Sequence, residues 1–245
     1  MGTVVVEYNC FKEKIIHYFD KYNILHSESI INDFYKFTVY LLSENEKYNL
    51  TSITEIDEII VKHYIDSIII QKYFEIPQNA KVIDIGTGAG FPALPIYIMR
   101  KDLHVTFLES IGKKINFVKN AAEKIESPQD FVFLNGRAEE YAKEPGLREI
   151  YDIAVFRAVA KLSVMCELST PFVKPKGYLI AYKSKNANSE IHEAQNALTT
   201  LGLKITKTIE FELENNARAC VIIQKQNPTP MKYPRKYPEI IKNPL

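Results

Sequence analysis

The sequence predicts an α/β fold with a mostly parallel sheet, preceded by a helical extension. Strand-like runs alternate with helical runs after residue 76, whereas before it apolar residues recur at spacings of three and four. The last two strand-like runs follow each other directly, which predicts a closing hairpin and an antiparallel edge. We therefore assign residues 1–75 to an N-terminal helical extension and residues 76–245 to the α/β domain with its basic C-terminal tail.

Composition narrows the class of protein. The 245 residues suffice for one full-sized core, and 46% hydrophobic with 25% charged residues is typical of a globular chain. A formal net charge of +1 excludes a strongly cationic binder of nucleic acid, so any such contact needs a local basic patch. Cys10, Cys166 and Cys220 lie far apart and form no metal-ligand spacing. No run reaches membrane-spanning length, and we expect a cytoplasmic protein without a metal.

The extension contains two long amphipathic runs, which we expect to be helices. They are INDFYKFTVYLLSENEKY at 31–48 and EIDEIIVKHYIDSIIIQKYF at 55–74.

Seven strands and five helices are expected in the second part of the chain. The strand-like runs are KVIDIG at 81–86, HVTFLE at 104–109, DFVFLN at 130–135, YDIAVF at 151–156, YLIAYK at 178–183, KITKTIEFEL at 204–213 and RACVIIQKQ at 218–226. The helical runs are ALPIYIMRK at 93–101, GKKINFVKNAAEKI at 112–125, AEEYAKE at 138–144, LSVMCELSTPFV at 162–173 and SEIHEAQNALTTLG at 189–202.

The turn after the first strand carries the strongest ligand signal. Parallel sheets bind ligands at the carboxyl ends of their strands, and this turn reads DIGTGAGF. A dinucleotide site needs a third glycine where Phe91 stands, and no Gly-Lys-Ser/Thr follows for a P-loop. The remaining pattern, Asp84 followed by Gly86, Gly88 and Gly90, is the usual turn for S-adenosylmethionine. The fold class is therefore a Rossmann-like, class I S-adenosylmethionine-dependent methyltransferase fold.

The next two strand ends supply further candidates for this cofactor. Glu109 closes the second strand, where a carboxylate can accept hydrogen bonds from both ribose hydroxyls. The alternative is a surface glutamate at the N-terminus of a helix. After the third strand, backbone groups of Ala138 and Glu139 are candidates for the adenine edge.

Several of these segments together resemble one family along nearly the whole chain. They are NLT (49–51), HYIDS (63–67), DIGTGAGFPALP (84–95), LES-x-GKK (108–114), NGRAE (135–139), FRAVA (156–160) and YPRK (233–236). This set resembles the bacterial methyltransferases that modify guanine N7 in 16S rRNA, the glucose-inhibited division protein B family. The resemblance implies that S-adenosylmethionine lies among Gly86, Phe91, Ala138, Glu139 and Arg157. Two departures are Ala93, where the family commonly has glycine, and the absence of a glycine soon after YPRK.

The segment after the fourth strand limits the atom that is methylated. Enzymes acting on exocyclic amines usually carry an Asn/Asp-Pro-Pro-Tyr/Phe segment there, whereas this chain reads VFRAVA. Methylation of pyrimidine C5 requires a nucleophilic cysteine, and Cys166 falls within an apolar helix. Guanine N7 needs neither device, because its lone pair carries no proton, so in-line transfer can proceed by positioning and desolvation.

Arg157 is the residue predicted to be catalytic. It ends the fourth strand, so its guanidinium should reach the crevice and hold the cofactor carboxylate or a phosphate beside the target base. The alternative is a structural ion pair. His63 and Asp66 share one helix face and either anchor the extension or contact substrate. Asn49 either caps a helix turn or helps to close the site.

The predicted RNA footprint is mainly the tail from residue 225 onward, where basic residues alternate with tyrosines and prolines favour an extended strip. The predicted RNA contacts are Arg137, Lys183, Lys185, Tyr233, Arg235 and Lys236. A merely solvated tail is the alternative reading.

The sequence thus predicts an S-adenosylmethionine-dependent rRNA (guanine-N7) methyltransferase acting on a loop of 16S rRNA, free or in the small-subunit particle. Two alternatives stay open. One is a methyltransferase of a small molecule or protein, and the other is a noncatalytic module that binds rRNA or senses the cofactor. No membrane or obligate protein partner is expected.

Overall fold

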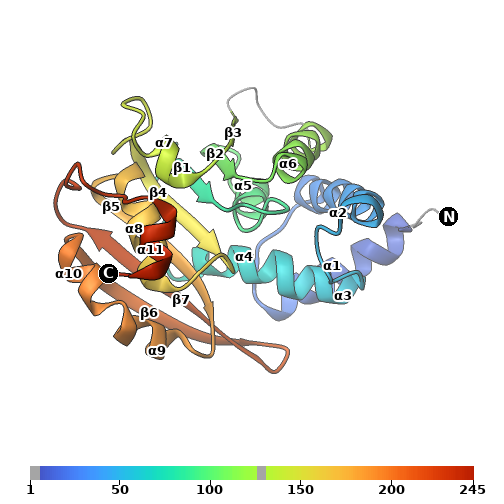
Figure 1. Ribbon diagram of the computed structural model, residues 1–245. Coiled ribbons are helices and arrows are strands. Elements are labelled where there is room, and N and C mark those ends of the chain that lie inside the picture. The colour runs from blue at the N-terminus through green and yellow to red at the C-terminus, as the bar shows by residue number, and fades with distance from the viewer. Residues whose placement is uncertain (1–5, 126–130) are drawn as a thin grey trace.

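The computed structural model describes residues 6–125 and 131–245 (Figure 1). Residues 1–5 of the predicted extension and Asp130 of the third predicted strand therefore lie outside the described residues. In the described part of the chain, no helix has both the length and the apolar character that a bilayer span requires.

A seven-stranded sheet forms the centre of the molecule, in the order β3-β2-β1-β4-β5-β7-β6. The first five strands pair in parallel, whereas β7 runs antiparallel to both β5 and β6. All seven predicted strands and the antiparallel edge are confirmed. The strands are β1 (Lys81–Ile85), β2 (His104–Glu109), β3 (Val132–Asn135), β4 (Tyr151–Arg157), β5 (Val173–Ser184), β6 (Leu203–Leu213) and β7 (Asn216–Lys225).

Helices fill the first part of the chain and separate the parallel strands. In the first part they are α1 (Tyr8–Lys21), α2 (Glu28–Tyr48), α3 (Ile56–Ile59), the π-helical turn η1 (Ile60–Ile65), α4 (Asp66–Ile68) and the 3₁₀ turn η2 (Ile69–Lys72). The later ones are α5 (Ala93–Met99), α6 (Gly112–Lys124), α7 (Ala138–Tyr141), α8 (Leu162–Ser169), the 3₁₀ turn η3 (Thr170–Phe172), α9 (Ala187–Glu193), α10 (Gln195–Thr200) and α11 (Tyr237–Lys242).

Two local predictions were wrong. The run at 189–202 forms two helices, because Ala194 between them leaves the helical region at φ −86° and ψ 2°. The tail is not extended throughout, because residues Tyr237–Lys242 form α11. A proline in the first turn of a helix removes no hydrogen bond, so Pro238 is compatible with α11.

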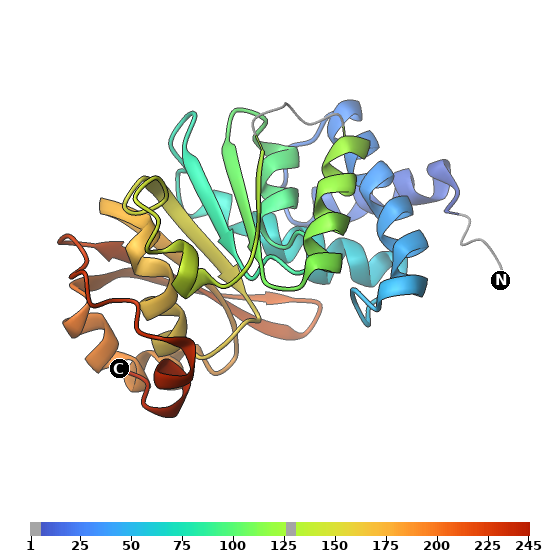
Figure 2. The same ribbon diagram turned by 45° about the horizontal axis from the view of Figure 1, so that its top comes forward.

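The two faces of the sheet bury separate hydrophobic clusters. Val82 and Val105 point into a cluster with α1, α2, α5 and α6, whereas the next residue of β1, Ile83, points into a cluster with α8 and α10. The helices before β1 and the helices α5 and α6 therefore cover one face, and the helices α7–α11 cover the other (Figure 2).

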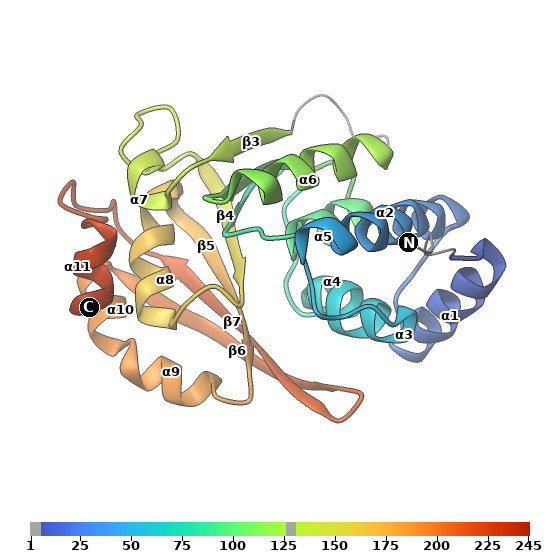
Figure 3. The same ribbon diagram turned by 45° about the vertical axis from the view of Figure 1, so that its right-hand side comes forward.

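The carboxyl ends of the five parallel strands meet at one edge of the sheet. Because β7 is antiparallel, its beginning also lies at this edge, where Arg218 pairs with Ser184 at the end of β5. The helix α2 packs against α5 and α6, and α4 packs against α5 (Figure 3). Asn49 ends α2 in a left-handed conformation with φ +50°, which confirms the capping alternative for this residue.

Candidate active site at the carboxyl edge of the sheet

A cavity of about 440 Å³ opens at the carboxyl ends of the parallel strands. Its volume lies in the range of small-molecule sites. The turns after β1, β2, β3 and β4 form most of the wall, and Thr51 and His63 close it from the helical extension. The predicted site residues that line it are Gly86, Gly88, Phe91, Glu109, Arg137, Ala138, Glu139 and Arg157.

The glycine turn presents bare backbone to this cavity. Gly86, Gly88 and Gly90 have φ angles of +73°, +60° and +88°, which residues other than glycine rarely adopt. A Cβ atom at Gly86 would lie 2.8 Å from Cγ2 of Val159, whereas at Gly88 nothing lies within 4 Å. Gly90 does not line the cavity, because it packs toward Leu94. Gly86 therefore lets the turn after β4 pack closely through Val159, and the open space for a ligand lies against Gly88.

Asp84 lies beneath the turn and is fully buried. Its Oδ2 accepts hydrogen bonds from the Thr87 hydroxyl at 2.8 Å and from the Ala93 N–H at 3.2 Å. Its Oδ1 has no hydrogen-bond partner among the described residues. Burial raises the pKa of Asp84 to about 7. Asp84 is not among the residues that line the cavity, so it would act on a cationic ligand such as S-adenosylmethionine only through its charge and through the turn that it holds.

Glu109 connects the first turn with the second. Its Oε2 accepts a hydrogen bond from the Gly88 N–H at 3.0 Å, and its Oε1 accepts one from the Ile111 N–H at 3.0 Å. The second bond lies at the start of α6, so the helix N-terminus alternative describes part of its role. A carboxylate has about four acceptor positions, and capacity remains for the hydroxyls of a ribose.

The end of β3 forms the third wall of the cavity. The Gly136 N–H and the Asn135 side-chain amide both donate to the Glu109 carbonyl, at 3.1 and 3.0 Å. These bonds hold the strand end beside β2, so that Ala138 and Glu139 face the cavity at the start of α7.

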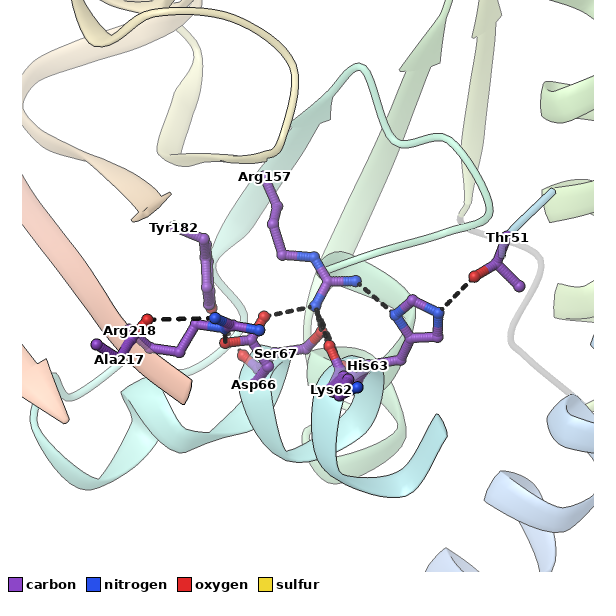
Figure 4. Close-up of polar contacts among 9 residues, drawn as sticks. All are labelled: Thr51, Lys62, His63, Asp66, Ser67, Arg157, Tyr182, Ala217 and Arg218. Carbon is purple, nitrogen blue, oxygen red and sulfur yellow. Dashed lines mark hydrogen bonds and ion pairs between the residues drawn. The ribbon is translucent and has the colours of Figure 1, made fainter. Parts of the chain in front are cut away.

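Arg157 is held by the helical extension (Figure 4). One terminal nitrogen donates to Asp66 Oδ2 at 2.9 Å and to the carbonyls of Lys62 and His63 at 3.3 Å each. The π-helical turn η1 contains both carbonyl groups. Arg157 therefore lines the cavity and also forms the ion pair that was the alternative reading.

His63 is a neutral ring inside the same cluster. Arg157 donates to Nδ1 at 3.4 Å, and since arginine only donates, the remaining proton lies on Nε2 and points to Thr51 Oγ1 at 2.9 Å. Burial, followed by the charge of Arg157, lowers the pKa of His63 to about 3. The anchoring alternative thus describes His63 and Asp66, although His63 also faces the cavity.

Phe91 forms the platform under this cluster. Its ring stacks on His63 with a centroid distance of 4.4 Å and an interplanar angle of 17°. The Arg157 guanidinium lies 5.0 Å from the same ring. A glycine at this position would remove this ring contact from both side chains.

Three of the predicted RNA contacts need correction, because their side chains are taken up by the protein. Arg235 forms a two-pronged ion pair with the buried Glu167, at 2.9 and 2.6 Å. Lys183 is bound by Glu190 at 2.8 Å, with 9% of its side chain exposed. The ring of Tyr233 is buried. Within the tail, Lys225 is also fully buried, against Glu149 at 2.5 Å.

Arg137, Lys185 and Lys236 remain exposed on the surface. Arg137 lies at the cavity, 5.2 Å from the ring of Tyr237, so α11 reaches the mouth of the site.

Sequence reasoning missed two features of the site. Thr51 was not singled out from the NLT segment, although a polar residue just after a helix end was a usable signal. Arg218 was missed because the antiparallel course of β7 brings the start of that strand, not its end, to the ligand edge.

Among the residues that the structure describes, no three His, Cys, Asp or Glu side chains lie together as a metal site would need.

Comparison with known proteins agrees with this geometry. A family model described as rRNA small subunit methyltransferase G matches residues 30–219. Proteins named ribosomal RNA small subunit methyltransferase G from Bacillus thuringiensis (strain Al Hakam) and Bacillus cereus (strain AH187) are each 43% identical over 206 residues, with 82% of this chain and 86% of theirs covered.

Solved structures share the fold at low identity. A SAM-dependent methyltransferase from Aquifex aeolicus has a TM-score of 0.53 at 16% identity, with 68% of this chain and 92% of that chain covered. An M1A22 tRNA methyltransferase from B. subtilis has a TM-score of 0.54 at 14% identity, with 69% and 68% covered. These likenesses confirm the Rossmann-like fold. The match to a methyltransferase family on this fold confirms S-adenosylmethionine as the cofactor. The chain belongs to the rRNA small subunit methyltransferase G family.

Proposed function

We propose that this enzyme methylates guanine N7 in a loop of 16S rRNA, by in-line transfer without a general base. The observation that carries the proposal is the state of His63. It is the only imidazole that lines the described cavity, and a pKa of about 3 keeps it neutral with Nδ1 turned toward Arg157. A ring in this state is a poor base near pH 7. A site whose imidazole is a poor base fits best a substrate atom that carries no proton to be removed, such as guanine N7.

The cysteines support the same choice. Cys166 is fully buried, and burial raises the pKa of its thiol to about 12. Cys220 is buried as well, whereas Cys10 is exposed on α1 and is not among the residues that line the cavity. Covalent addition to a pyrimidine ring requires a thiolate in the site, so C5 methylation is disfavoured.

The roles of the residues follow from their positions. Gly86, Gly88 and Glu109 would hold the cofactor, which supplies the activated methyl group when bound. Arg157 is fixed by Asp66 at 2.9 Å and by the ring of Phe91, and its charge faces the crevice. A fixed guanidinium can orient a phosphate or a guanine oxygen at little cost in reorganisation.

The exposed cations beside the crevice are the proposed RNA contacts. Arg137 and Lys236 flank α11 near the cavity mouth, and Lys185 follows β5. Single-stranded loops present unstacked bases that a pocket can accept, so a loop of 16S rRNA, free or in the small-subunit particle, is the proposed substrate. Such a substrate implies a reaction in the cytoplasm.

Transfer of radiolabelled methyl groups tests the proposal. The purified chain is incubated with labelled cofactor and with deproteinised 16S rRNA, small-subunit particles, bulk protein or small metabolites. We expect label in rRNA, and aniline cleavage after borohydride reduction should map it to an N7-methylated guanosine. A strain that lacks the gene should lose this modification and regain it on complementation.

The alternatives give different results. Label in protein or in small molecules, with none in rRNA, would indicate another methyltransferase. Binding of rRNA and S-adenosylhomocysteine without any transfer would indicate a noncatalytic module. Label at a pyrimidine or at an exocyclic amine would contradict the base-free mechanism.

A further inference from the structure

A second cavity of about 560 Å³ adjoins the cofactor cavity. The two share His63 of the helical extension and the residues Arg157, Ala158 and Val159 at the end of β4 and in the turn after it. Ala158 has a φ angle of +55°, which residues other than glycine rarely adopt. Val159, the next residue, exposes 44% of its surface. This turn therefore forms the partition between the two cavities.

The charges around the second cavity are not balanced. Lys62 pairs with Glu58, and Lys183 pairs with Glu190, so each lysine has its own carboxylate. Two arginines, in contrast, share one carboxylate: Asp66 binds Arg157 at 2.9 Å and Arg218 at 3.4 Å (Figure 4).

One guanidinium charge therefore stays uncompensated at the cavity wall. A partly buried charge without a counter-ion is costly, and an anion that enters the cavity would relieve this cost.

Of the two arginines that share Asp66, Arg218 is the one with an unused hydrogen-bond donor. Its Nε faces Asp66, and one terminal nitrogen donates to the Ala217 carbonyl at 3.2 Å. Its other terminal nitrogen has no acceptor among the described residues, and 24% of the side chain is exposed. Arg157, with 12% exposed, is already bound by two carbonyls and by Asp66.

We propose that the second cavity is a phosphate-binding subsite, in which Arg218 binds the phosphodiester that adjoins the target nucleotide. A phosphodiester carries one negative charge, which matches the one unpaired guanidinium, and the arginine fork suits its oxygens. The target base would then occupy the cofactor side of the partition. This subsite rests on the proposed action on RNA, and it adds an RNA contact on β7, outside the C-terminal tail.

The first test needs neither rRNA nor methyl transfer. Guanosine and guanosine 3′,5′-bisphosphate are titrated into the wild-type chain saturated with S-adenosylhomocysteine. A charge-assisted hydrogen bond typically contributes enough for the bisphosphate to bind roughly tenfold more tightly. Arg218→Ala should abolish this preference, and Arg218→Lys should restore part of it because the charge returns without the fork.

The second test uses kinetics on rRNA. In Arg218→Ala, the KM for rRNA should rise about tenfold with kcat changed less than about twofold, and the salt slope of RNA binding should fall by about one. The matched control is Lys204→Ala, which removes one exposed positive charge from the same hairpin, away from the cavity. This control variant should change neither the KM for rRNA nor the salt slope of RNA binding.

The outcomes separate the subsite from the proposed function. Equal wild-type affinity for guanosine and its bisphosphate would overturn the subsite, even if rRNA is methylated normally. A fall in kcat at unchanged KM in Arg218→Ala would also overturn it, because Arg218 would then act only by positioning Arg157 through Asp66. If the preference depends on Arg218 but no methyl group enters rRNA, the subsite stands and the proposed function fails.

Discussion

Asp84 should make cofactor affinity depend on pH around neutrality. Its carboxyl is fully buried beneath the glycine turn, and burial raises its pKa to about 7 from an ordinary value near 3.8. At 1.36 kcal/mol per unit, ionising it in the unliganded protein costs about 4 kcal/mol. A ligand with an ammonium group near the turn favours the ionised carboxylate. S-adenosylhomocysteine should therefore bind the deprotonated form.

The expected signature is a slope below pH 7. The dissociation constant of S-adenosylhomocysteine should rise by up to about tenfold per pH unit below pH 7, and by about fifteenfold in total between pH 7 and pH 5.5. Calorimetry in two buffers of different ionisation enthalpy should detect proton release at pH 6.5. The scan ends at pH 7.5, because the ligand's own amine titrates near 7.7–8.0.

Asp84→Asn should bind with an affinity that does not change between pH 5.5 and 7.5. The matched control is Asp102→Asn, because Arg100 already lowers the pKa of Asp102 to about 2 and this carboxylate lies away from the cavity. That variant should keep the slope. A flat wild-type affinity, or an equal slope in Asp84→Asn, would refute the reasoning.

The same carboxyl should make the unliganded fold less stable as pH rises. Its folded pKa lies above its unfolded value, so the folded state binds more protons between about pH 4 and pH 7. Stability should fall by at most about 2.5 kcal/mol between pH 5 and pH 7.5, and urea unfolding at these two pH values measures the decline. Asp84→Asn should show a smaller decline.

Three further predictions concern the turn, the fixed arginine and the tail. Gly86→Val should abolish S-adenosylhomocysteine binding in calorimetry, because its φ of +73° costs a side chain about 1–2 kcal/mol and the added atoms collide with Val159, which also lines the cavity. Arg157→Ala should lower kcat roughly a hundredfold or more, and Arg157→Lys should lose much of the activity. The wild-type kcat, measured with both substrates saturating, should stay flat from about pH 6 to 8, because the pKa of His63 is about 3. A steep limb of this profile near pH 6.5 would contradict the prediction. Lys236→Ala should lower the salt slope of rRNA binding by about one and leave Tm unchanged. Arg235→Ala should instead lower the free energy of unfolding by about 3 kcal/mol, because the buried carboxylate of Glu167 loses its guanidinium partner. Equal effects of both tail variants on the slope would return Arg235 to the RNA surface.

The order of elements could be predicted from the sequence because the strands are short apolar runs and the helices have clear periodicity. Residues at the strand ends, such as Glu109 and Arg157, could be placed at one edge because parallel strands share their carboxyl edge. The break at Ala194 could not be predicted, since alanine favours helix and no glycine or proline marks an end there.

The partners of charged side chains were the least predictable part. Arg235 and Lys236 are neighbours in a basic segment, and local sequence does not distinguish them. The fold directs Arg235 onto Glu167 of α8, a residue 68 positions away, and leaves Lys236 in solvent. A basic segment therefore predicts the sign of a surface but not which of its members are available to RNA.

Phe91 shows how one residue can define both the cofactor and the substrate side of the site. In a dinucleotide turn, glycine at this position lets the helix approach the strand around a pyrophosphate. Here the ring fills that space, packs on Phe37 at 5.5 Å and supports His63 and Arg157 from below. The same substitution that removes the dinucleotide pattern therefore docks the helical extension onto the glycine turn. Through this contact the extension supplies Asp66 and the carbonyls that fix Arg157. The helices before β1 are thus part of the active site, and we expect that a chain shortened to residues 76–245 would lose the orientation of Arg157.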